Sequence, residues 1–153
     1  MFDYFTKSTL VPLLLRLGLA VIFLYHGAEK VTREGNELGA AWAKAPPGQE
    51  TMPRPMQLAV AWGELLGGAA LAIGLLSRLA AAGIAVIMIG AIAVVHGRHG
   101  FPMNPHFEDG QLIMGYEYNF LILVVCAAVI LLGSGTLSVD RFFRWRKRTG
   151  QAA

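Results

Sequence analysis

Four long runs of apolar and small residues dominate the chain. We place them at residues 10–27, 56–76, 79–96 and 116–132. About 20 helical residues cross the ~30 Å hydrocarbon layer of a bilayer, so each run is long enough, or nearly so, to span it. Only Ser77-Arg78 separates the second run from the third, which makes these two runs antiparallel neighbours. The pattern predicts an all-α integral membrane protein, an up-down four-helix bundle that forms a single domain over residues 1–153.

Composition supports this class. Of the 153 residues, 55% are hydrophobic and 15% are charged, whereas a soluble domain usually carries about 25% charged residues. The single cysteine, Cys126, allows no internal disulfide and no thiolate metal cluster. The net charge of +3 does not indicate nucleic-acid binding, because the charges gather at the ends of the apolar runs. We expect the basic and aromatic tail, residues 138–153, to lie on an anionic lipid surface.

The distribution of lysine and arginine predicts the orientation. Eight of them belong to the side that holds the termini and the Ser77-Arg78 turn: Lys7, Arg16, Arg78, Arg141, Arg144, Arg146, Lys147 and Arg148. Five belong to the side that holds the two long connections, residues 31–55 and 97–115. The positive-inside rule then places both termini in the cytoplasm and both long connections outside.

One carboxylate, Glu64, lies inside an apolar run. A charge at bilayer depth costs at least ~2.5–3.5 kcal/mol, so it tends to face protein or water, to find a partner or to be protonated. The neighbouring glycines Gly63, Gly67 and Gly68 remove side-chain bulk and allow helices to approach. Arg16 is about two turns inside the first run, where it either anchors the topology or pairs with Asp140 or an anionic lipid.

Polar residues from all four runs fall at a similar depth in the predicted bundle. The first run ends at His26, the second meets Glu64 early, the third ends at His96, and the fourth begins at Tyr116-Glu117. We therefore predict a polar cluster in the outer half of the bundle, centred on Glu64. Its expected partners are His26, His96 and Glu117, and Asn119 lies at a similar depth.

The order of short motifs along the chain resembles the DoxX family. The resemblance rests on Leu15-Arg16-Leu17, Tyr25-His26-Gly27 with Lys30, Gly63 to Gly68, Gly74 to Arg78, His96, Gly115 to Asn119, and Gly133 to Asp140. It covers nearly the whole chain and implies a four-helix membrane protein of the bacterial or archaeal cytoplasmic (inner) membrane. Some members of that family, the DoxD-like ones, form the membrane part of a thiosulfate:quinone oxidoreductase. Others associate with redox or thiol-stress proteins, so the resemblance implies protein partners as well as lipid.

The first functional hypothesis is a subunit of a quinone-linked oxidoreductase. In it, His26, His96, Glu64 and Glu117 are the catalytic candidates, since imidazoles and desolvated carboxylates can relay protons near neutral pH. Tyr25, Tyr116 and Asn119 are the candidates for binding the quinone. The chain has no nucleotide or flavin motif and no thiol pair, so the electrons must come from a bound cofactor or a partner.

Three alternatives stay open. Two histidines on different helices could ligate haem iron, and two histidines with two carboxylates could hold zinc or a non-haem iron. The chain could instead be a non-catalytic structural or assembly subunit of a larger membrane complex, with Glu64 paired to a histidine or to Lys30 only to satisfy a buried polar group. Transport is the third alternative, although no inverted repeat is apparent.

Overall fold

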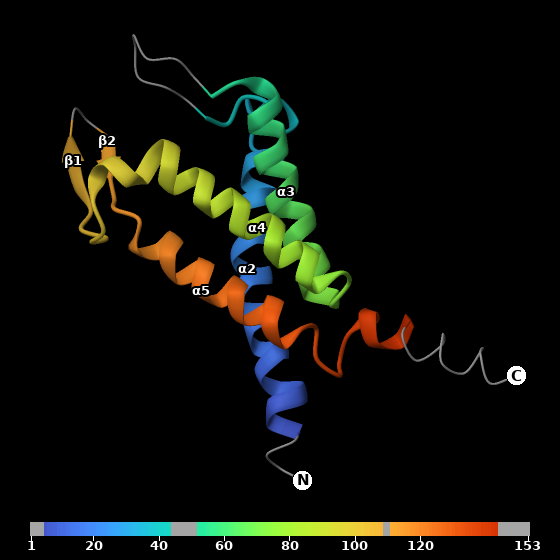
Figure 1. Cartoon of the computed structure of the whole chain (residues 1–153). Coiled ribbons are helices and arrows are strands. Elements are labelled where there is room, and N and C mark those ends of the chain that lie inside the picture. The colour runs from blue at the N-terminus through green and yellow to red at the C-terminus, as the bar shows by residue number, and fades with distance from the viewer. Residues whose placement is uncertain (1–4, 44–51, 109–110, 144–153) are drawn as a thin grey trace, which may run out of the picture.

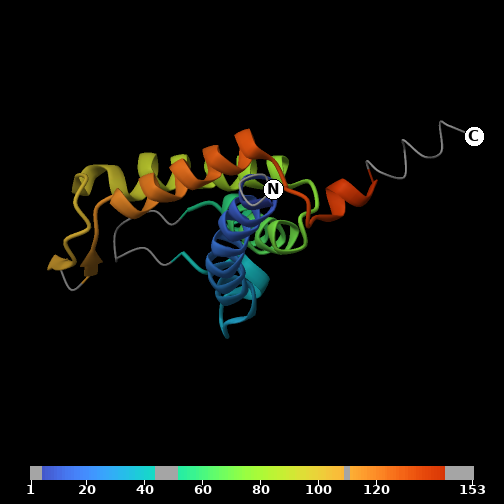
Figure 2. The same ribbon diagram turned by 90° about the horizontal axis from the view of Figure 1, so that it is seen from below.

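The fold is built from four long helices. The computed structural model describes residues 5–43, 52–108 and 111–143. The helices are α2 (Val11–Thr32), α3 (Arg54–Ile73), α4 (Ser77–Ala91) and α5 (Glu117–Leu132). Helix α2 packs mainly against α3 and α4 mainly against α5, and the second pair crosses the first obliquely (Figures 1 and 2). The predicted fold class, an all-α membrane bundle, is confirmed.

Three helical segments are long and apolar enough to span a membrane: Thr6–Thr32, Arg54–Ile73 and Ser77–His99. The first consists of a π-helical turn, η1 (Thr6–Leu10), and α2, and the second is α3 alone. The third consists of α4 and two further helical turns, η3 (Ile92–His96) and η4 (Gly97–His99). Helix α5 is apolar but has only 16 residues, so it rises about 24 Å. The three long segments support the predicted membrane location most directly.

Glycine and proline set the helix ends. Pro53 and Pro55 stand at the start of α3, where a missing backbone N–H does least harm. Gly74 ends α3 with φ at 73°, a left-handed conformation that favours glycine. Gly133 ends α5 with φ at 79° and an extended ψ of −167°, also a backbone conformation that favours glycine. The connection between α3 and α4 is as short as predicted, but it lies at residues 74–76, and Ser77 and Arg78 are the first residues of α4.

The predicted role of the glycines near Glu64 is confirmed. A Cβ atom on Gly68 would lie 2.8 Å from the backbone nitrogen of Leu24, so α2 and α3 touch there backbone to backbone. On the other side of α3, Gly63 and Gly67 face isoleucine side chains of α4. Small residues therefore let α3 pack closely between its two neighbours.

The apolar core lies where the two helix pairs cross. It contains Leu19, Ala20 and Phe23 of α2, Leu71 of α3, Ala81, Ile84 and Met88 of α4, and Ile122, Cys126 and Val129 of α5. Cys126 is fully buried and unbonded to other cysteines, as expected for a small packing residue.

One small element was not predicted. The connection between α4 and α5 contains an antiparallel hairpin of two short strands, β1 (His106–Glu108) and β2 (Gln111–Ile113). Strands of three residues are too short to show the alternation of polar and apolar residues by which a strand is recognised. In the other long connection, a 3-10 turn, η2 (Glu37–Gly39), is described, while residues 44–51 lie outside the described part of the chain.

The two ends of the fold need names. We call the end that holds residues 5–10, the α3–α4 turn and residues 133–143 the turn end. We call the end that holds residues 33–43 and 97–116 the loop end. The helices gather at the turn end, whereas the two pairs diverge towards the loop end (Figure 1). Residues 144–153 of the predicted basic tail lie outside the described residues.

A buried arginine holds the turn end together. Arg16 of α2 is 1% exposed, and its Nη2 donates a hydrogen bond to the backbone oxygen of Leu137 at 2.7 Å. The negative charge of Asp140 acts on Arg16 electrostatically, but no salt bridge joins the two among the described residues, so the pairing with Asp140 stays a prediction. The Asp140 carboxylate also accepts hydrogen bonds from the backbone nitrogens of Leu76 and Ser77 at 2.7 and 3.1 Å. One acidic residue thus caps α4 and offsets the buried charge of α2.

Candidate functional site

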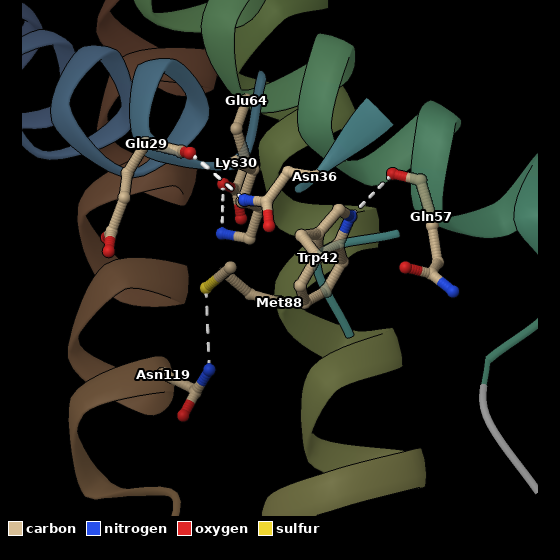
Figure 3. Close-up of polar contacts among 8 residues, drawn as sticks. All are labelled: Glu29, Lys30, Asn36, Trp42, Gln57, Glu64, Met88 and Asn119. Carbon is tan, nitrogen blue, oxygen red and sulfur yellow. Dashed lines mark hydrogen bonds and ion pairs between the residues drawn. The ribbon is translucent and has the colours of Figure 1, made fainter. Parts of the chain in front are cut away.

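Glu64 lies on the face of α3 that packs against α2. Its side chain is 5% exposed, and its Oε2 lies 2.5 Å from the Nζ of Lys30, whose side chain is 19% exposed (Figure 3). A hydrogen bond between two charged groups is about twice as strong as one between neutral groups. The buried carboxylate that the sequence singled out therefore has a cationic partner from the last turns of α2.

Trp42 covers the other side of Lys30. The Lys30 ammonium lies 5.0 Å from the centre of the Trp42 ring, a distance at which a cation is attracted to the aromatic face. The Trp42 Nε1 donates to the backbone oxygen of Gln57 at 2.9 Å. The Gln57 side chain in turn accepts a hydrogen bond from the Ala43 nitrogen at 2.9 Å. Gln57, itself buried, thus fastens the loop after α2 to the start of α3.

Asn36 bends the chain so that Trp42 can return to α2. Its Nδ2 donates to the backbone oxygen of Glu29 at 3.2 Å, and its backbone oxygen accepts from Gly39 and Ala41 at 2.8 and 3.1 Å. Gly39 adopts φ of 97°, and a Cβ there would lie 2.8 Å from the Cβ of Ala61. Only glycine suits this close approach of the loop to α3.

A polar cavity opens at this point of the loop end. Its volume is about 430 Å³, and its lining residues are Glu29, Lys30, Arg33, Asn36 and Trp42. Lys30 is therefore shared: it contacts the buried Glu64 and also lines a cavity that opens to the surface. The ion pair is thus in contact with a space that another molecule can enter.

Met88 of α4 and Asn119 of α5 form a second polar contact, in the core between these two helices. The Asn119 Nδ2 donates to the Met88 sulfur at 3.5 Å, and both residues are buried. Figure 3 shows Met88 between the Lys30–Glu64 pair and Asn119. A thioether is a weak acceptor, so Asn119 is held in the core without a strong partner there.

The remaining ionisable residues of the predicted cluster stand at the loop end of the other helix pair. His96 has its Nδ1 3.1 Å from the backbone oxygen of Met114. Glu117 accepts a hydrogen bond from the backbone nitrogen of Met103 at 2.9 Å, and its side chain is exposed. Both residues therefore fasten the connection between α4 and α5 to the ends of these helices.

The aromatic candidates lie on surfaces. Tyr25 and His26 are exposed on α2 and contact each other edge to face, with ring centres 5.4 Å apart. Tyr116 makes the same kind of contact with Phe101 at 5.4 Å. Tyr25 therefore contacts its neighbour on α2, and Tyr116 contacts the connection that precedes α5.

Within the described residues, no hydrogen bond or ion pair joins Glu64 to His26, His96 or Glu117. Its direct partner is Lys30, which the sequence analysis named only for a structural pairing. The catalytic roles of His26, His96 and Glu117 stay predictions. Trp42 and Gln57 were missed as site residues. Trp42 and Gln57 stand on either side of a proline-rich connection, and neither residue type at such a position indicates a functional site from sequence alone.

The structure adds no support for a metal site. Among the side chains that the structure describes, those of residues 5–43, 52–105 and 114–143, no three His, Cys, Asp or Glu lie close enough together to hold a metal ion. His26 and His96, the pair considered for haem, stand on different helix pairs.

Comparison with known proteins gives a family and a relative. The family model described as DoxX matches residues 11–97, the range that holds α2, α3 and α4. A Bacillus subtilis (strain 168) protein named "Putative oxidoreductase CatD" is 29% identical over 141 residues, which are 92% of this chain and 92% of that protein. No solved structure matches the chain. Lys30, Trp42, Gln57 and Glu64 all fall within the range matched by the family model.

Proposed function

Because the chain belongs to the DoxX family of membrane proteins, we propose that it is the membrane subunit of an oxidoreductase system and exchanges protons with a quinone at the Lys30–Glu64 pair. One observation carries this proposal: a buried carboxylate is bonded to a lysine that also lines an open cavity of about 430 Å³. The name of the Bacillus subtilis relative supports a redox role.

The chemistry assigned to the pair is proton transfer. A quinone becomes a quinol when it takes up two electrons and two protons, and catalysis needs a proton donor beside each carbonyl oxygen as it gains charge. The Lys30 ammonium donates a hydrogen bond to that oxygen and then the proton, and Glu64 stabilises the ammonium that re-forms when a proton arrives through the cavity. The second carbonyl oxygen lies on the opposite side of the ring and takes its proton from water at the open side of the cavity. The electrons come from a partner protein that carries a redox centre such as a flavin.

The cavity offers what a quinone head group needs. N–H donors for the carbonyl oxygens come from Lys30 and Arg33, and an aromatic surface comes from Trp42. Of the predicted catalytic residues, the proposal uses Glu64 directly. The count of lysine and arginine supports an orientation with both termini in the cytoplasm of a bacterium or archaeon, so that the loop end faces outside.

A structural role is the second candidate, and a different observation favours it. Lys30 is held from two sides, by Glu64 and by the Trp42 ring, while Gln57 fastens the loop that carries Trp42. In this second role, the network fixes the loop on the helices and takes no part in chemistry. The chain is then a subunit that organises a larger complex.

Quenching of Trp42 fluorescence by a quinone tests the first proposal. The protein with Trp62 and Trp145 replaced by phenylalanine retains only Trp42, and the matched control protein retains only Trp62. Decylubiquinone added to detergent-solubilised protein should quench Trp42 saturably, because a bound quinone lies within contact of the ring. Quenching of Trp62 should be weak and linear with quinone concentration. Equal, non-saturable quenching of the two proteins would refute a quinone site beside Trp42.

A double substitution then separates the two candidate functions. Methionine at both Lys30 and Glu64 removes both charges and keeps unbranched side chains of similar length. A proton-exchange site predicts a folded protein that no longer binds the quinone. A purely structural pair predicts a folded protein that behaves as the wild type in every redox measurement.

A further inference from the structure

A second cavity, at the turn end, is distinct from the site just described. Its volume is about 760 Å³, and three cationic residues line it: Lys7 before α2, Arg78 at the start of α4, and Arg141 after α5. Segments far apart in the sequence meet here, since the Thr136 nitrogen bonds the Ser8 oxygen at 3.0 Å. The proposed function does not involve these three cationic residues.

Among the described residues that line the cavity, one is a carboxylate, Asp140, and its charge is already engaged. Its oxygens accept hydrogen bonds from Leu76 and Ser77, and its charge is opposed by the buried Arg16. Asp140 also occupies the N–H groups at the start of α4, so the helix end is not the anion site. Among the described lining residues, three cations thus face one carboxylate, and two of these cations are the arginines Arg78 and Arg141.

Arg78 is held in a fixed place with most of its donors unused. A Cβ on Gly133 would lie 3.3 Å from both the Nε and the Nη2 of Arg78, so the guanidinium packs across the end of α5. Its hydrogen bond is a long one, from Nη2 to the Leu131 oxygen at 3.4 Å. An arginine carries five N–H donors in a planar fork that matches a phosphate. Within the described residues no carboxylate forms a salt bridge with Arg78.

The apolar part of the wall indicates which kind of anion fits. Leu76, Leu79 and Leu132 line the cavity beside the cations, and their side chains are 59%, 68% and 51% exposed. They stand where α3 has ended, α4 begins and α5 ends, at one end of the membrane-spanning segments. Phosphate-binding cations beside exposed leucines match a lipid, whose charged head group and acyl chains meet at this level of a bilayer.

We infer that the turn-end cavity binds the phosphate diester of an anionic phospholipid, with Arg78 and Arg141 on the phosphate and the leucines against the upper acyl chains. This site is independent of the quinone proposal. It makes one lipid an ordered part of the junction between α2, the α3–α4 turn and residues 133–143. A free phosphate shares the head-group chemistry but makes no use of the leucines.

Native mass spectrometry of the full chain tests this inference. The detergent-solubilised protein is titrated with phosphatidylglycerol or with phosphatidylcholine, and the bound lipid is counted. The test variant is R78Q/R141Q, and the matched control is R54Q/R98Q, which removes two exposed arginines at the loop end. Each basic residue near an anionic head group contributes about a factor of five. R78Q/R141Q should therefore lose about 30-fold in affinity for phosphatidylglycerol, and the control should keep that affinity.

Three outcomes would overturn the inference. An equal loss in the control would mean that overall charge, including the basic tail common to all the proteins, attracts the lipid. Wild-type protein that retains the two lipids equally would show no anionic site. Displacement of phosphatidylglycerol by inorganic phosphate at equal concentration would assign the cavity to a soluble anion. Circular dichroism and thermal unfolding, unchanged in both variants, establish that lost binding is not lost folding.

Discussion

Replacing one partner of the Lys30–Glu64 pair should destabilise the protein strongly, and replacing both should destabilise it much less. The substitutions are Lys30→Met, Glu64→Met and the two together. Each single change leaves the other charge buried without its partner at 2.5 Å. The double change leaves two apolar side chains of similar length, which can pack against each other.

The expected magnitude follows from the burial of the two side chains. Removing one partner of a buried ion pair costs about 3–5 kcal/mol. Lys30 keeps 19% of its side-chain exposure and a contact with Trp42, so we expect about 3 kcal/mol for each single variant, at the lower end of that range. The double variant should lose about 1–2 kcal/mol, because apolar replacement of a whole pair is often nearly neutral. The coupling free energy between the two positions is then about 4 kcal/mol.

Unfolding in mixed micelles, followed by circular dichroism as the fraction of sodium dodecyl sulfate rises, measures these free energies. The chain offers a matched control pair, Glu29 and Arg33, which are bonded at 3.0 Å but are 44% and 69% exposed. An exposed pair four residues apart contributes about 0.3–0.5 kcal/mol. A coupling between Lys30 and Glu64 no larger than that of the control pair would refute a buried, desolvated ion pair at this site.

Three further predictions concern other parts of the fold. Arg16→Met should lower the unfolding free energy by about 3 kcal/mol in the same micelle assay, because it removes the hydrogen bond from the buried guanidinium to the Leu137 oxygen and the positive charge that acts on the half-buried Asp140; a loss below about 1 kcal/mol would contradict the role given to Arg16. Gly27→Ala should cost about 1–3 kcal/mol, since its new methyl group would meet the backbone of α3. Gly18→Ala, which meets nothing within 4 Å, should be neutral or stabilising by up to about 1 kcal/mol, and equal effects of the two would show that α2 and α3 are not in close contact at Gly27. His26→Ala and His96→Ala should leave quinone quenching of Trp42 unchanged, because neither ring contacts the Lys30–Glu64 pair; loss of saturable quenching in either would restore that histidine to the site.

Much of the fold could be predicted because the bilayer sets strict requirements. The length and spacing of the apolar runs were enough to predict that α2, α3 and α4 exist and that α3 and α4 are neighbours, although α2 continues to Thr32, five residues beyond the predicted end, and α4 begins at Ser77. The close approach of α2 and α3 at Gly68 followed from the same reasoning about small residues. For Arg16 the sequence offered a topology anchor, Asp140 or an anionic lipid, and Asp140 is the carboxylate whose charge acts on it in the structure.

The candidate site could be predicted only in part, because depth in a membrane does not fix direction. Counting residues from a helix end gives the height of Glu64, His96 and Glu117. It does not say towards which neighbour each side chain points, nor that the two helix pairs diverge at the loop end (Figure 1). His96 and Glu117 therefore stand at a similar position along their helices without contacting Glu64.

The path of the loop after α2 was not predicted from the sequence. Trp42 returns to cover Lys30 through contacts that involve Asn36, Gly39 and Gln57. These contacts depend on a bend in which both Glu37 and Leu38 adopt positive φ. Only glycine and, less often, asparagine or aspartate indicate a positive φ in a sequence, because other residues rarely adopt it. Gly35, Asn36 and Gly39 indicate a turn in this loop, but nothing in the sequence showed that Glu37 and Leu38 between them would adopt positive φ as well.

The most direct test of the account is the quinone content of the protein purified from its native membrane in mild detergent. The account predicts that wild-type protein retains a quinone in near-stoichiometric amount, and that the Lys30→Met, Glu64→Met double variant, purified in parallel and equally folded, has lost it. Equal quinone content in the two proteins, or none in either, would contradict a quinone site at the Lys30–Glu64 pair and favour the structural role.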